Sequence, residues 1–266
     1  MDSVRFGELL TSRFIIGSNP ISGFSHQTPE RDAEMRGYFT VARVKALFRQ
    51  AEGLGINTVI ARADAHITRI MMEYRAEGGA LRWFAQSCPE FKSFHRSLSN
   101  ALLGGASALY LHGGEADFRL AHSTLAEART GLDRARAAGL ATGVAGHNPE
   151  VFRFAETPLD CDFYMCSYYN SARRDCRPNH VSGMAEWFHD DDRARMIEVI
   201  RDLSRPVIHY KVLAAGRNDP AAAFEVAARA MRPTDAVCVG VFPKDDPDML
   251  AVDVALFEEA VAAARV

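Results

Sequence analysis

The chain has 266 residues, of which 48% are hydrophobic and 24% are charged, and its formal net charge is −3. This is the composition of an ordinary globular protein. Without an excess of Lys and Arg it argues against non-specific binding to nucleic acid or to an anionic membrane. No run of about 18 apolar residues is present, so we expect no membrane span.

The five cysteines predict free thiols rather than a disulfide framework. Their number is odd, and no two of them are spaced as CxxC. Free thiols are typical of a reducing compartment. The first residues also lack the basic and then apolar pattern of a signal segment. We therefore expect a cytoplasmic protein.

Short apolar runs alternate with amphipathic, helix-forming segments along the chain. Near-continuous apolar runs of this length are typical of buried parallel strands. In chain order, the eight predicted strands are residues 14–18, 57–61, 81–86, 108–112, 141–145, 163–167, 206–210 and 236–241. Strands that alternate with helices predict a parallel sheet. Eight such units predict that the sheet closes, giving a (β/α)₈ TIM barrel in which residues 1–266 form a single domain.

Two connections are longer than the others. They run from about residue 19 to 38, after the first strand, and from 168 to 192, after the sixth strand. Long connections in a compact domain are often binding loops. Both should lie over the C-terminal face of the barrel, where enzymes of this architecture carry out their chemistry. His26 and His180 lie in these connections and could reach a substrate.

Polar side chains at the ends of the predicted strands are the candidates for a site. The predicted catalytic residues are His112, His147, His209, Lys211 and Asp64. The predicted substrate-binding residues are Asn19, Arg62, Gln86, Asn148, Cys166, Tyr168, Tyr210 and Lys244. Because the C-terminal ends of barrel strands meet at one mouth, we expect these side chains to converge there.

His112, His147 and His209 follow or belong to three different strands. Three imidazoles at one barrel mouth could hold a divalent metal, with Asp64 as a fourth ligand. They could equally be general acids and bases, since imidazole titrates near neutral pH. Each could also be a hydrogen-bonded structural residue.

Lys211 stands at the end of the seventh predicted strand. Desolvation there would lower the pKa of Lys211 and make its amine available as a base or a Schiff-base nucleophile. A salt bridge to Asp64 or another carboxylate is the alternative. For Cys166, packing as a small buried residue is favoured over a nucleophilic role. Tyr168 and Tyr210 could contact a ligand or pack at the rim.

Several strand endings resemble those of the aldo-keto reductase superfamily. The matching segments are AEGLGINTVIARADAH, LYLHGG, TGVAGHNPEVF, FYMCSYYN, IHYKVLAAGRN and VGVFPKDDPDMLAVDVALF. The resemblance implies a TIM barrel that binds NADPH, with Tyr210 stacked on the nicotinamide and Lys244 at the 2′-phosphate.

Of the residues that perform carbonyl reduction in that superfamily, His112 matches the histidine. The Asp position falls at about Ile60, the Tyr position at Ala65 or His66, and the Lys position at about Gln86. The glutamine that contacts nicotinamide falls at about Cys166. The resemblance therefore implies a diverged member with a rebuilt site.

The leading hypothesis is an enzyme that performs acid–base chemistry, metal-assisted or through a Schiff base, on a hydroxylated or carbonyl, sugar-like small molecule. An isomerase, epimerase or lyase would use such chemistry. The alternative is an NADPH-dependent oxidoreductase of the aldo-keto reductase type. A second alternative is a barrel that binds a ligand without catalysis.

Overall fold

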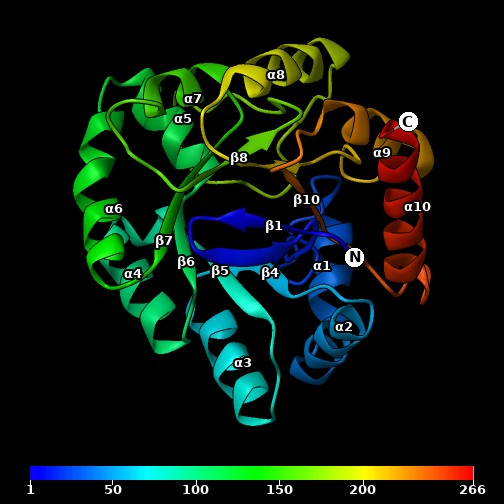
Figure 1. Ribbon diagram of the computed structural model, residues 1–266. Helices are drawn as coiled ribbons and strands as arrows, with labels where there is room; N and C mark the ends of the chain where they lie inside the picture. The colour runs from blue at the N-terminus through cyan, green and yellow to red at the C-terminus, as the bar shows by residue number, and fades with distance from the viewer. Residues whose placement is uncertain (266) are drawn as a thin grey trace.

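The computed structural model describes residues 1–265, and it begins with a β-hairpin that the sequence pattern did not predict. Strand β1 (Ser3–Phe6) pairs antiparallel with β2 (Leu9–Ser12) across a tight turn in which Gly7 adopts φ +57°. Figure 1 shows the hairpin lying across one end of the barrel. Phe6 packs edge-on against Phe84 and Phe163, with ring centroids 6.2 and 5.7 Å apart. The hairpin therefore closes the N-terminal end of the barrel with apolar side chains.

Eight parallel strands form the closed barrel and confirm the predicted (β/α)₈ fold. Neighbouring strands follow the order of the chain, and the last strand pairs with the first to close the ring. The barrel strands are β3 (Phe14–Gly17), β4 (Thr58–Arg62), β5 (Arg82–Gln86), β6 (Ala108–Leu111), β7 (Ala141–Gly146), β8 (Phe163–Ser167), β9 (Val207–Tyr210) and β10 (Ala236–Val239). Each overlaps a predicted strand, with ends that differ by no more than two residues.

Helices surround the barrel, as Figure 1 shows. They are α1 (Pro29–Tyr38), α2 (Val41–Gly53), α3 (Ala65–Ala76), α4 (Phe94–Leu103), α5 (Gly113–Ala121), α6 (Ala128–Ala137), α7 (Pro149–Ala155), α8 (Asp190–Asp202), α9 (Pro220–Ala230) and α10 (Met249–Ala264), with short 3-10 turns at Pro89–Phe91 and Leu125–Glu127. None of the helices within residues 1–265 has both the length and the apolar run needed to cross a bilayer.

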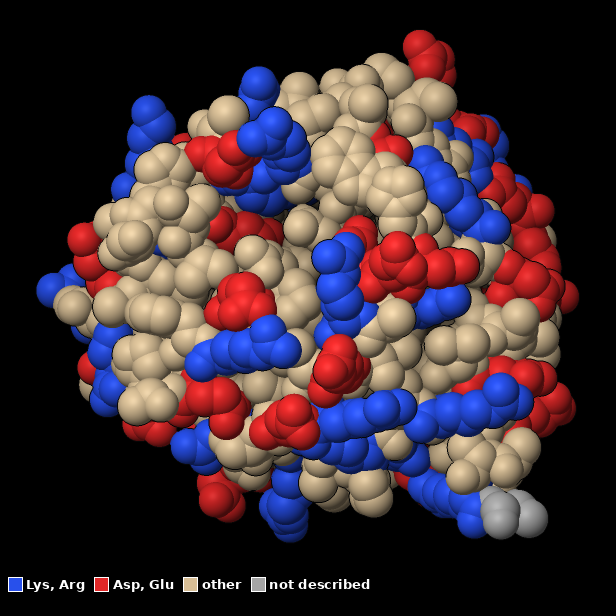
Figure 2. Space-filling view, turned by 90° about the horizontal axis from the view of Figure 1, so that it is seen from above, with Lys and Arg blue, Asp and Glu red and all other residues tan. Residues whose placement is uncertain are grey.

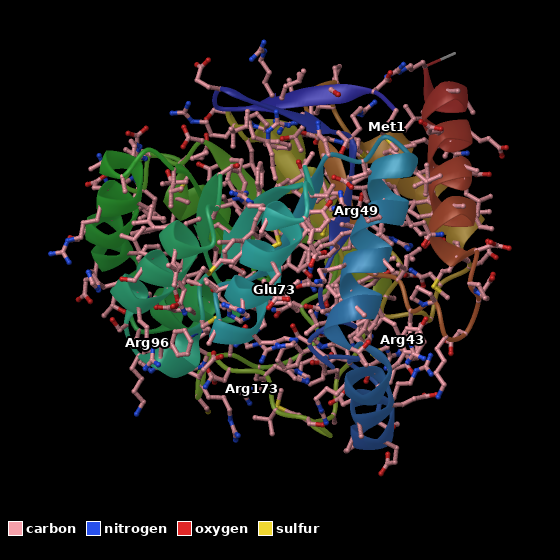
Figure 3. The ribbon with its side chains drawn as sticks, turned by 90° about the horizontal axis from the view of Figure 1, so that it is seen from below. Met1, Arg43, Arg49, Glu73, Arg96 and Arg173 are labelled. Atoms are coloured by element: carbon pink, nitrogen blue, oxygen red, sulfur yellow. The ribbon has the colours of Figure 1, made fainter. Side chains whose placement is uncertain are left out.

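The two long connections differ from each other. The first contains α1, whose N-terminus is capped by the Thr28 side chain and carries Pro29 in its first turn. The second follows β8 and contains no helix or strand between residues 168 and 189. In Figure 3, Arg173 of this β8–α8 loop lies at the end of the barrel opposite the hairpin and Met1. Both connections leave the C-terminal ends of barrel strands.

Two separate apolar cores follow from the alternation of side chains along each strand. One core fills the barrel and includes Phe6, Phe84, Phe163 and Met165. The other lies between the strands and the surrounding helices. Residues next to each other in a strand therefore face different cores, which decides which strand-end side chains can reach the barrel mouth. On the outer surface, Figure 2 shows acidic and basic side chains interspersed over the face it presents.

Candidate functional site

A cavity of about 720 Å³ opens at the C-terminal ends of the barrel strands. This volume lies within the range of sites for small molecules. Seven of the predicted site residues line it: Asn19, Arg62, Gln86, His112, His147, Tyr210 and Lys211. The two long connections supply further walls, including His26, Arg174 and His180.

His147 is held between Asp117 of α5 and Tyr210 of β9. Its Nδ1 atom lies 2.7 Å from Asp117 Oδ2, and its Nε2 atom lies 3.3 Å from the Tyr210 hydroxyl. The backbone N–H groups of His147 and Asn148 also donate to the Asp117 carboxylate, at 3.0 and 3.1 Å. An ionised carboxylate only accepts hydrogen bonds, so Nδ1 of His147 carries the proton and Nε2 presents a lone pair.

Burial dominates the electrostatics of this group. It lowers the pKa of His147 below the ordinary value, against the opposing charge of Asp117. Burial also raises the pKa of the Tyr210 hydroxyl well above its ordinary value. At neutral pH both groups are therefore uncharged, and the Tyr210 hydroxyl can donate to His147 Nε2 or to the carbonyl oxygen of Gly146, each at 3.3 Å. An arrangement of this kind can accept or deliver a proton at the Tyr210 oxygen.

His112 follows β6 and lies at the N-terminus of α5. Its Nδ1 atom is buried and has no hydrogen-bond partner among the described residues. Burial, together with the neighbouring His147 and Arg62, lowers the pKa of His112 well below the ordinary value. This neutral imidazole has a polar atom free for a ligand, because buried polar groups are otherwise almost always paired.

Two adjacent glycines allow this close packing. A Cβ on Gly113 would lie 3.0 Å from the Tyr210 hydroxyl and 3.1 Å from His147 Cε1. A Cβ on Gly114 would lie only 2.2 Å from the carbonyl oxygen of Pro178 in the β8–α8 loop. The start of α5 thus approaches both the site and the loop above it in a way that a side chain would prevent.

Lys211 lies directly after β9, with φ +59° in the left-handed region. Its ammonium donates to the Ser171 hydroxyl at 3.0 Å and lies 5.9 Å from the Phe188 ring centroid. Desolvation lowers the pKa of Lys211 to about 8, although the charge of Glu186 opposes this effect. The alternative expectation for Lys211, a salt bridge to Asp64 or another carboxylate, is not met among residues 1–265, and Asp64 pairs with Arg62 instead.

Arg174 and Arg62 bring two guanidinium groups to the cavity wall. Arg62 is neutralised by Asp64, at 3.2 Å, and by Glu90. Arg174 is 6% exposed and donates to the carbonyl oxygen of Asn179, while its buried Nε has no hydrogen-bond partner in the part of the chain that the structure describes. No carboxylate of the described residues forms an ion pair with Arg174, which leaves a buried positive charge facing the cavity.

The prediction that His209 joins the other two histidines is wrong. Its side chain is fully buried outside the barrel, where Nδ1 lies 3.0 Å from the Tyr168 hydroxyl and Nε2 lies 3.3 Å from Asp235 Oδ2. Tyr210 faces the barrel interior, so its neighbour His209 must face the helices. The three-histidine metal site is therefore not assembled.

The prediction that Cys166 and Tyr168 contact a substrate is wrong for the same reason. Both belong to the core between strands and helices, and neither lines the cavity. Met165, the neighbour of Cys166 in β8, faces the cavity instead. Burial raises the pKa of the Cys166 thiol well above the ordinary value, as expected for a packing residue.

Three further predicted residues lie outside the cavity. Asp64 and Asn148 are helix N-caps, accepting hydrogen bonds from the backbone N–H groups of Ile67 and Glu150. Lys244 is half-exposed and forms an ion pair with Glu34 of α1, at 2.7 Å. The predicted catalytic role of Asp64 and the predicted ligand contacts of Asn148 and Lys244 are not supported by these positions.

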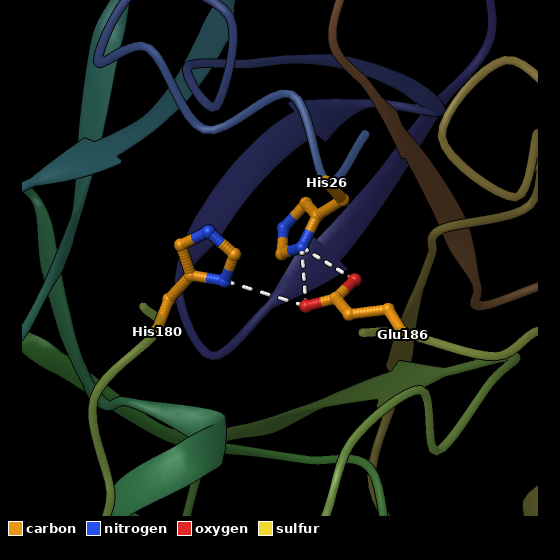
Figure 4. A group of neighbouring side chains, drawn as sticks. All are labelled: His26, His180 and Glu186. Atoms are coloured by element: carbon orange, nitrogen blue, oxygen red, sulfur yellow. Dashed lines mark hydrogen bonds and ion pairs between the residues drawn. The ribbon is translucent and has the colours of Figure 1, made fainter. Parts of the chain in front are cut away.

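A second polar group at the cavity combines His26 and His180 with Glu186, which the sequence pattern did not single out (Figure 4). His26 Nδ1 lies 2.9 Å from both Glu186 oxygens, and His180 Nδ1 lies 3.3 Å from one of them. Desolvation and the charge of Lys211 lower the pKa of His26 to about 3. Burial opposes ionisation of Glu186, but the polar contacts with His180 and His26 and the charge of Lys211 outweigh it and lower its pKa.

Asp117, Arg174 and Glu186 are the site residues that sequence reasoning missed. Asp117 lies inside a helix, and the other two lie in a loop without regular structure. No spacing signal links them to the histidines, since the contacts depend on how α5 and the loop pack on the barrel.

Comparison with known proteins supports the fold. No protein-family model matches the chain, and no curated protein matches it in sequence. Among solved structures, a protein from Pseudomonas aeruginosa described as an aldo-keto reductase has a TM-score of 0.64 at 17% identity, covering 97% of this chain and 94% of that chain. An aldo-keto reductase from Bacillus halodurans in its holo form has a TM-score of 0.61 at 11% identity, covering 99% and 96% of the two chains.

The same barrel also resembles enzymes with other names. A truncated 3-deoxy-D-arabino-heptulosonate 7-phosphate synthase from Thermotoga maritima has a TM-score of 0.54 at 11% identity, covering 99% of this chain and 90% of that chain. At such identities a likeness speaks for the fold, and a fold can host many reactions. The chain therefore has the (β/α)₈ barrel fold of the aldo-keto reductases, as its strand endings indicated.

Proposed function

We propose that this protein is an enzyme that moves a proton on a small carbonyl or hydroxylated substrate, as an isomerase, epimerase or lyase does. The observation that carries the proposal is the Asp117–His147–Tyr210 chain, which ends in the cavity. His112 and Lys211 remain in the proposed catalytic set. His209 and Asp64 leave it, because their side chains point elsewhere.

The proton path follows from the hydrogen bonds. A substrate C–H next to a carbonyl gives its proton to the Tyr210 oxygen, while the Tyr210 proton passes to Nε2 of His147. The imidazolium that forms is stabilised by Asp117, which already holds Nδ1–H. Return of the proton to another substrate carbon or oxygen restores the resting state. The charge of the protein is therefore the same before and after the reaction.

The cations of the cavity would stabilise the enolate that this step creates. Among residues 1–265, Arg174 forms no ion pair with a carboxylate, and Lys211 donates to the neutral Ser171 hydroxyl without forming an ion pair. Preorganised donors in a site shielded from water are strong stabilisers of a developing negative charge. These two groups therefore favour a substrate that carries a carboxylate or phosphate beside its carbonyl.

The test is isotope exchange, which detects proton abstraction before the net reaction is known. Purified protein is incubated in D₂O with small carbonyl acids and sugar phosphates, and loss of the C–H signal is followed by NMR. We expect exchange that falls by about 10²–10⁴-fold in Tyr210→Phe and in His147→Asn. Tyr38→Phe is the matched control, because Tyr38 packs on Phe242 away from the proton path.

Two outcomes would reject this proposal. Exchange that persists in both site variants would remove the proton path from His147 and Tyr210. If no substrate exchanges but some stabilise the fold against heat, the barrel binds ligands without this catalysis. A separate test addresses Lys211. Borohydride reduction that fixes a carbonyl substrate covalently on Lys211 would indicate Schiff-base chemistry instead of the proton path.

Reduction by NADPH is the second candidate function, favoured by the fold and by the shape of the cavity. The cavity extends from Tyr210 to Phe242 and Met249 beyond β10, the region where the resemblance implies a cofactor. Titration with NADPH, followed by nicotinamide fluorescence, tests this candidate. Saturation at micromolar concentrations that is lost in Tyr210→Ala would support it, and no binding at millimolar NADPH would reject it.

A further inference from the structure

The cluster of His26, His180 and Glu186 joins the two long connections over the barrel. His26 belongs to the segment between β3 and α1, and the other two residues belong to the β8–α8 loop. Figure 4 shows the three side chains converging, with one nitrogen of each imidazole directed at the Glu186 carboxylate. His26 and His180 also line the cavity, so the cluster has one side that faces the candidate site.

The candidate ligand atoms lie close enough together to share one metal ion. One nitrogen from each histidine and one oxygen of Glu186 all lie within 4.8 Å of one another. Metal–ligand bonds of about 2.0–2.2 Å in a tetrahedron place neighbouring ligand atoms roughly 3.3–3.6 Å apart. The nitrogen–oxygen distances of 2.9 and 3.3 Å need only small outward shifts to reach that spacing.

The Glu186 carboxylate is also buried to a degree that is unusual for a charged group. The side chain of Glu186 is 2% exposed, and within residues 1–265 it contacts the two histidines and forms no ion pair with a Lys or Arg. Carboxylates are rarely buried unless they are paired or coordinate a metal. His180 Nδ1 is buried and has no hydrogen-bond partner among residues 1–265. It lies 3.3 Å from one oxygen of Glu186, so this nitrogen is directed at the cluster without forming a hydrogen bond there.

Surrounding groups hold the ligands in place. His26 is kept at φ +57°, an uncommon conformation for a residue with a side chain, and such strain is concentrated at functional sites. The Asn19 amide lies 3.3 Å from His26 Nε2, the ring nitrogen that would not bind the metal. The rings of Phe24 and His180 pack edge to face, with centroids 5.5 Å apart. Outer contacts of this kind orient metal-binding histidines.

We propose that His26, His180 and Glu186 bind a divalent transition metal such as Zn²⁺. One coordination position of the ion would remain open to the cavity. Two imidazoles and a carboxylate suit zinc, and three protein ligands with an open position are typical of catalytic rather than structural sites. A metal here would bind an oxygen of the substrate from the side of the two loops. The site replaces the three-histidine arrangement that the strand endings had indicated.

Calorimetric titration of chelator-treated protein with Zn²⁺ tests the site directly. We expect one ion bound per chain, and affinity weaker by at least about 100-fold in His180→Gln and in Glu186→Gln. His66→Gln is the matched control, because His66 is exposed at the start of α3 and should leave binding unchanged. Circular dichroism shows whether each variant is folded.

Co²⁺ identifies the ligands in the unaltered protein, which covers the case in which a variant fails to fold. We expect visible d–d absorption of a low-coordinate site without a thiolate charge-transfer band. Such a band would mean that an exposed cysteine such as Cys176 holds the ion, and it would overturn the proposal. Absence of Zn²⁺ binding, or equal binding by His180→Gln, would overturn it as well. Neither measurement needs a substrate, so the outcome is separate from that of the isotope exchange.

Discussion

The Nδ1 atom of His147 lies 2.7 Å from the carboxylate of Asp117, although the two residues are 30 positions apart in the chain. Asp117 also accepts hydrogen bonds from two backbone N–H groups after β7. This carboxylate therefore fixes both the position and the tautomer of the imidazole. The lone pair of Nε2 is directed to Tyr210 as a result.

Asp117→Asn should switch the tautomer of His147. An Asn amide can donate to Nδ1, which would move the ring proton to Nε2. Loss of the negative charge also removes the influence that raises the pKa of His147, so that pKa should fall further. Histidine ¹H–¹⁵N NMR measures both effects without a substrate. We expect isotope exchange to fall by about 10²–10⁴-fold.

Asp133→Asn is the control for this change, since Asp133 is a half-exposed residue of α6 paired with Arg129 and Arg136. It should leave the signals of His147 unaltered. An unchanged tautomer in Asp117→Asn would contradict the assigned proton position.

Asp235→Asn should destabilise the fold rather than impair the cavity directly. Burial opposes ionisation of Asp235, but hydrogen bonds from His209 and Arg232 outweigh it and lower its pKa to about 2. Breaking a buried ion pair typically costs about 3–5 kcal/mol. We expect a loss of that order in the free energy of unfolding at pH 7, measured by urea denaturation.

The pH dependence of the free energy of unfolding tests whether this loss comes from the charge of Asp235. A carboxyl whose pKa is lowered by folding contributes its stability above its unfolded pKa of about 3.9, and loses it as the pH falls towards 2. The difference between Asp235→Asn and the parent should therefore narrow below about pH 4. A constant difference at all pH values would refute the ionic explanation.

Lys211→Met should stabilise the protein at neutral pH. Folding lowers the pKa of Lys211 from 10.5 to about 8, so burial of the ammonium costs stability below pH 8. The cost disappears as the pH rises towards the unfolded pKa, because the amine is then neutral in both states. A pKa lowering of this size corresponds to a loss of about 3 kcal/mol at most in the free energy of unfolding.

Urea denaturation at a series of pH values measures this effect. The gain in Lys211→Met should be largest at pH 7 and shrink above pH 8. Lower stability of the variant at pH 7 would mean that the contacts to Ser171 and the charge of Glu186 outweigh desolvation.

Gly114→Ala should displace the β8–α8 loop. The added Cβ would lie 2.2 Å from the Pro178 carbonyl oxygen and 3.1 Å from His112 Cε1, so backbone must move. Overpacking of this kind costs about 1–3 kcal/mol. We expect a lower melting temperature and weaker Zn²⁺ binding, since His180 and Glu186 belong to the same loop.

Gly53→Ala is the matched control at the C-terminal end of α2. Its Cβ would meet nothing within 4 Å, and Ala is the better helix former. Equal effects of the two substitutions would show that the contact with Pro178 does not hold the loop.

The barrel itself could be predicted from local patterns. Eight apolar runs, each followed by an amphipathic segment, specify buried strands and covering helices wherever they are packed. The run at 163–167 matches β8 at both ends. The N-terminal hairpin could not be found in this way, because β1 and β2 have only four residues each and are stabilised by Phe6 inside the barrel.

The site was only partly predictable. Strand ends placed His112, His147, Tyr210 and Lys211 at the mouth correctly, since all barrel strands open to the same face. The predicted strand ends could not decide whether a side chain points into the barrel or towards the surrounding helices. A shift of one residue exchanges interior and exterior, and for that reason His209 was misassigned while its neighbour Tyr210 was not.

The sequence by itself therefore determined the architecture and the face on which the chemistry-bearing residues gather, because these depend on the periodicity of short segments. Only the tertiary structure decided which groups touch. The contact of Asp117 with His147 and the contact of His26 with Glu186 join positions 30 and 160 residues apart in the chain. Contacts of this kind are set by the packing of helix α5 and the two long connections on the barrel, which no local pattern encodes.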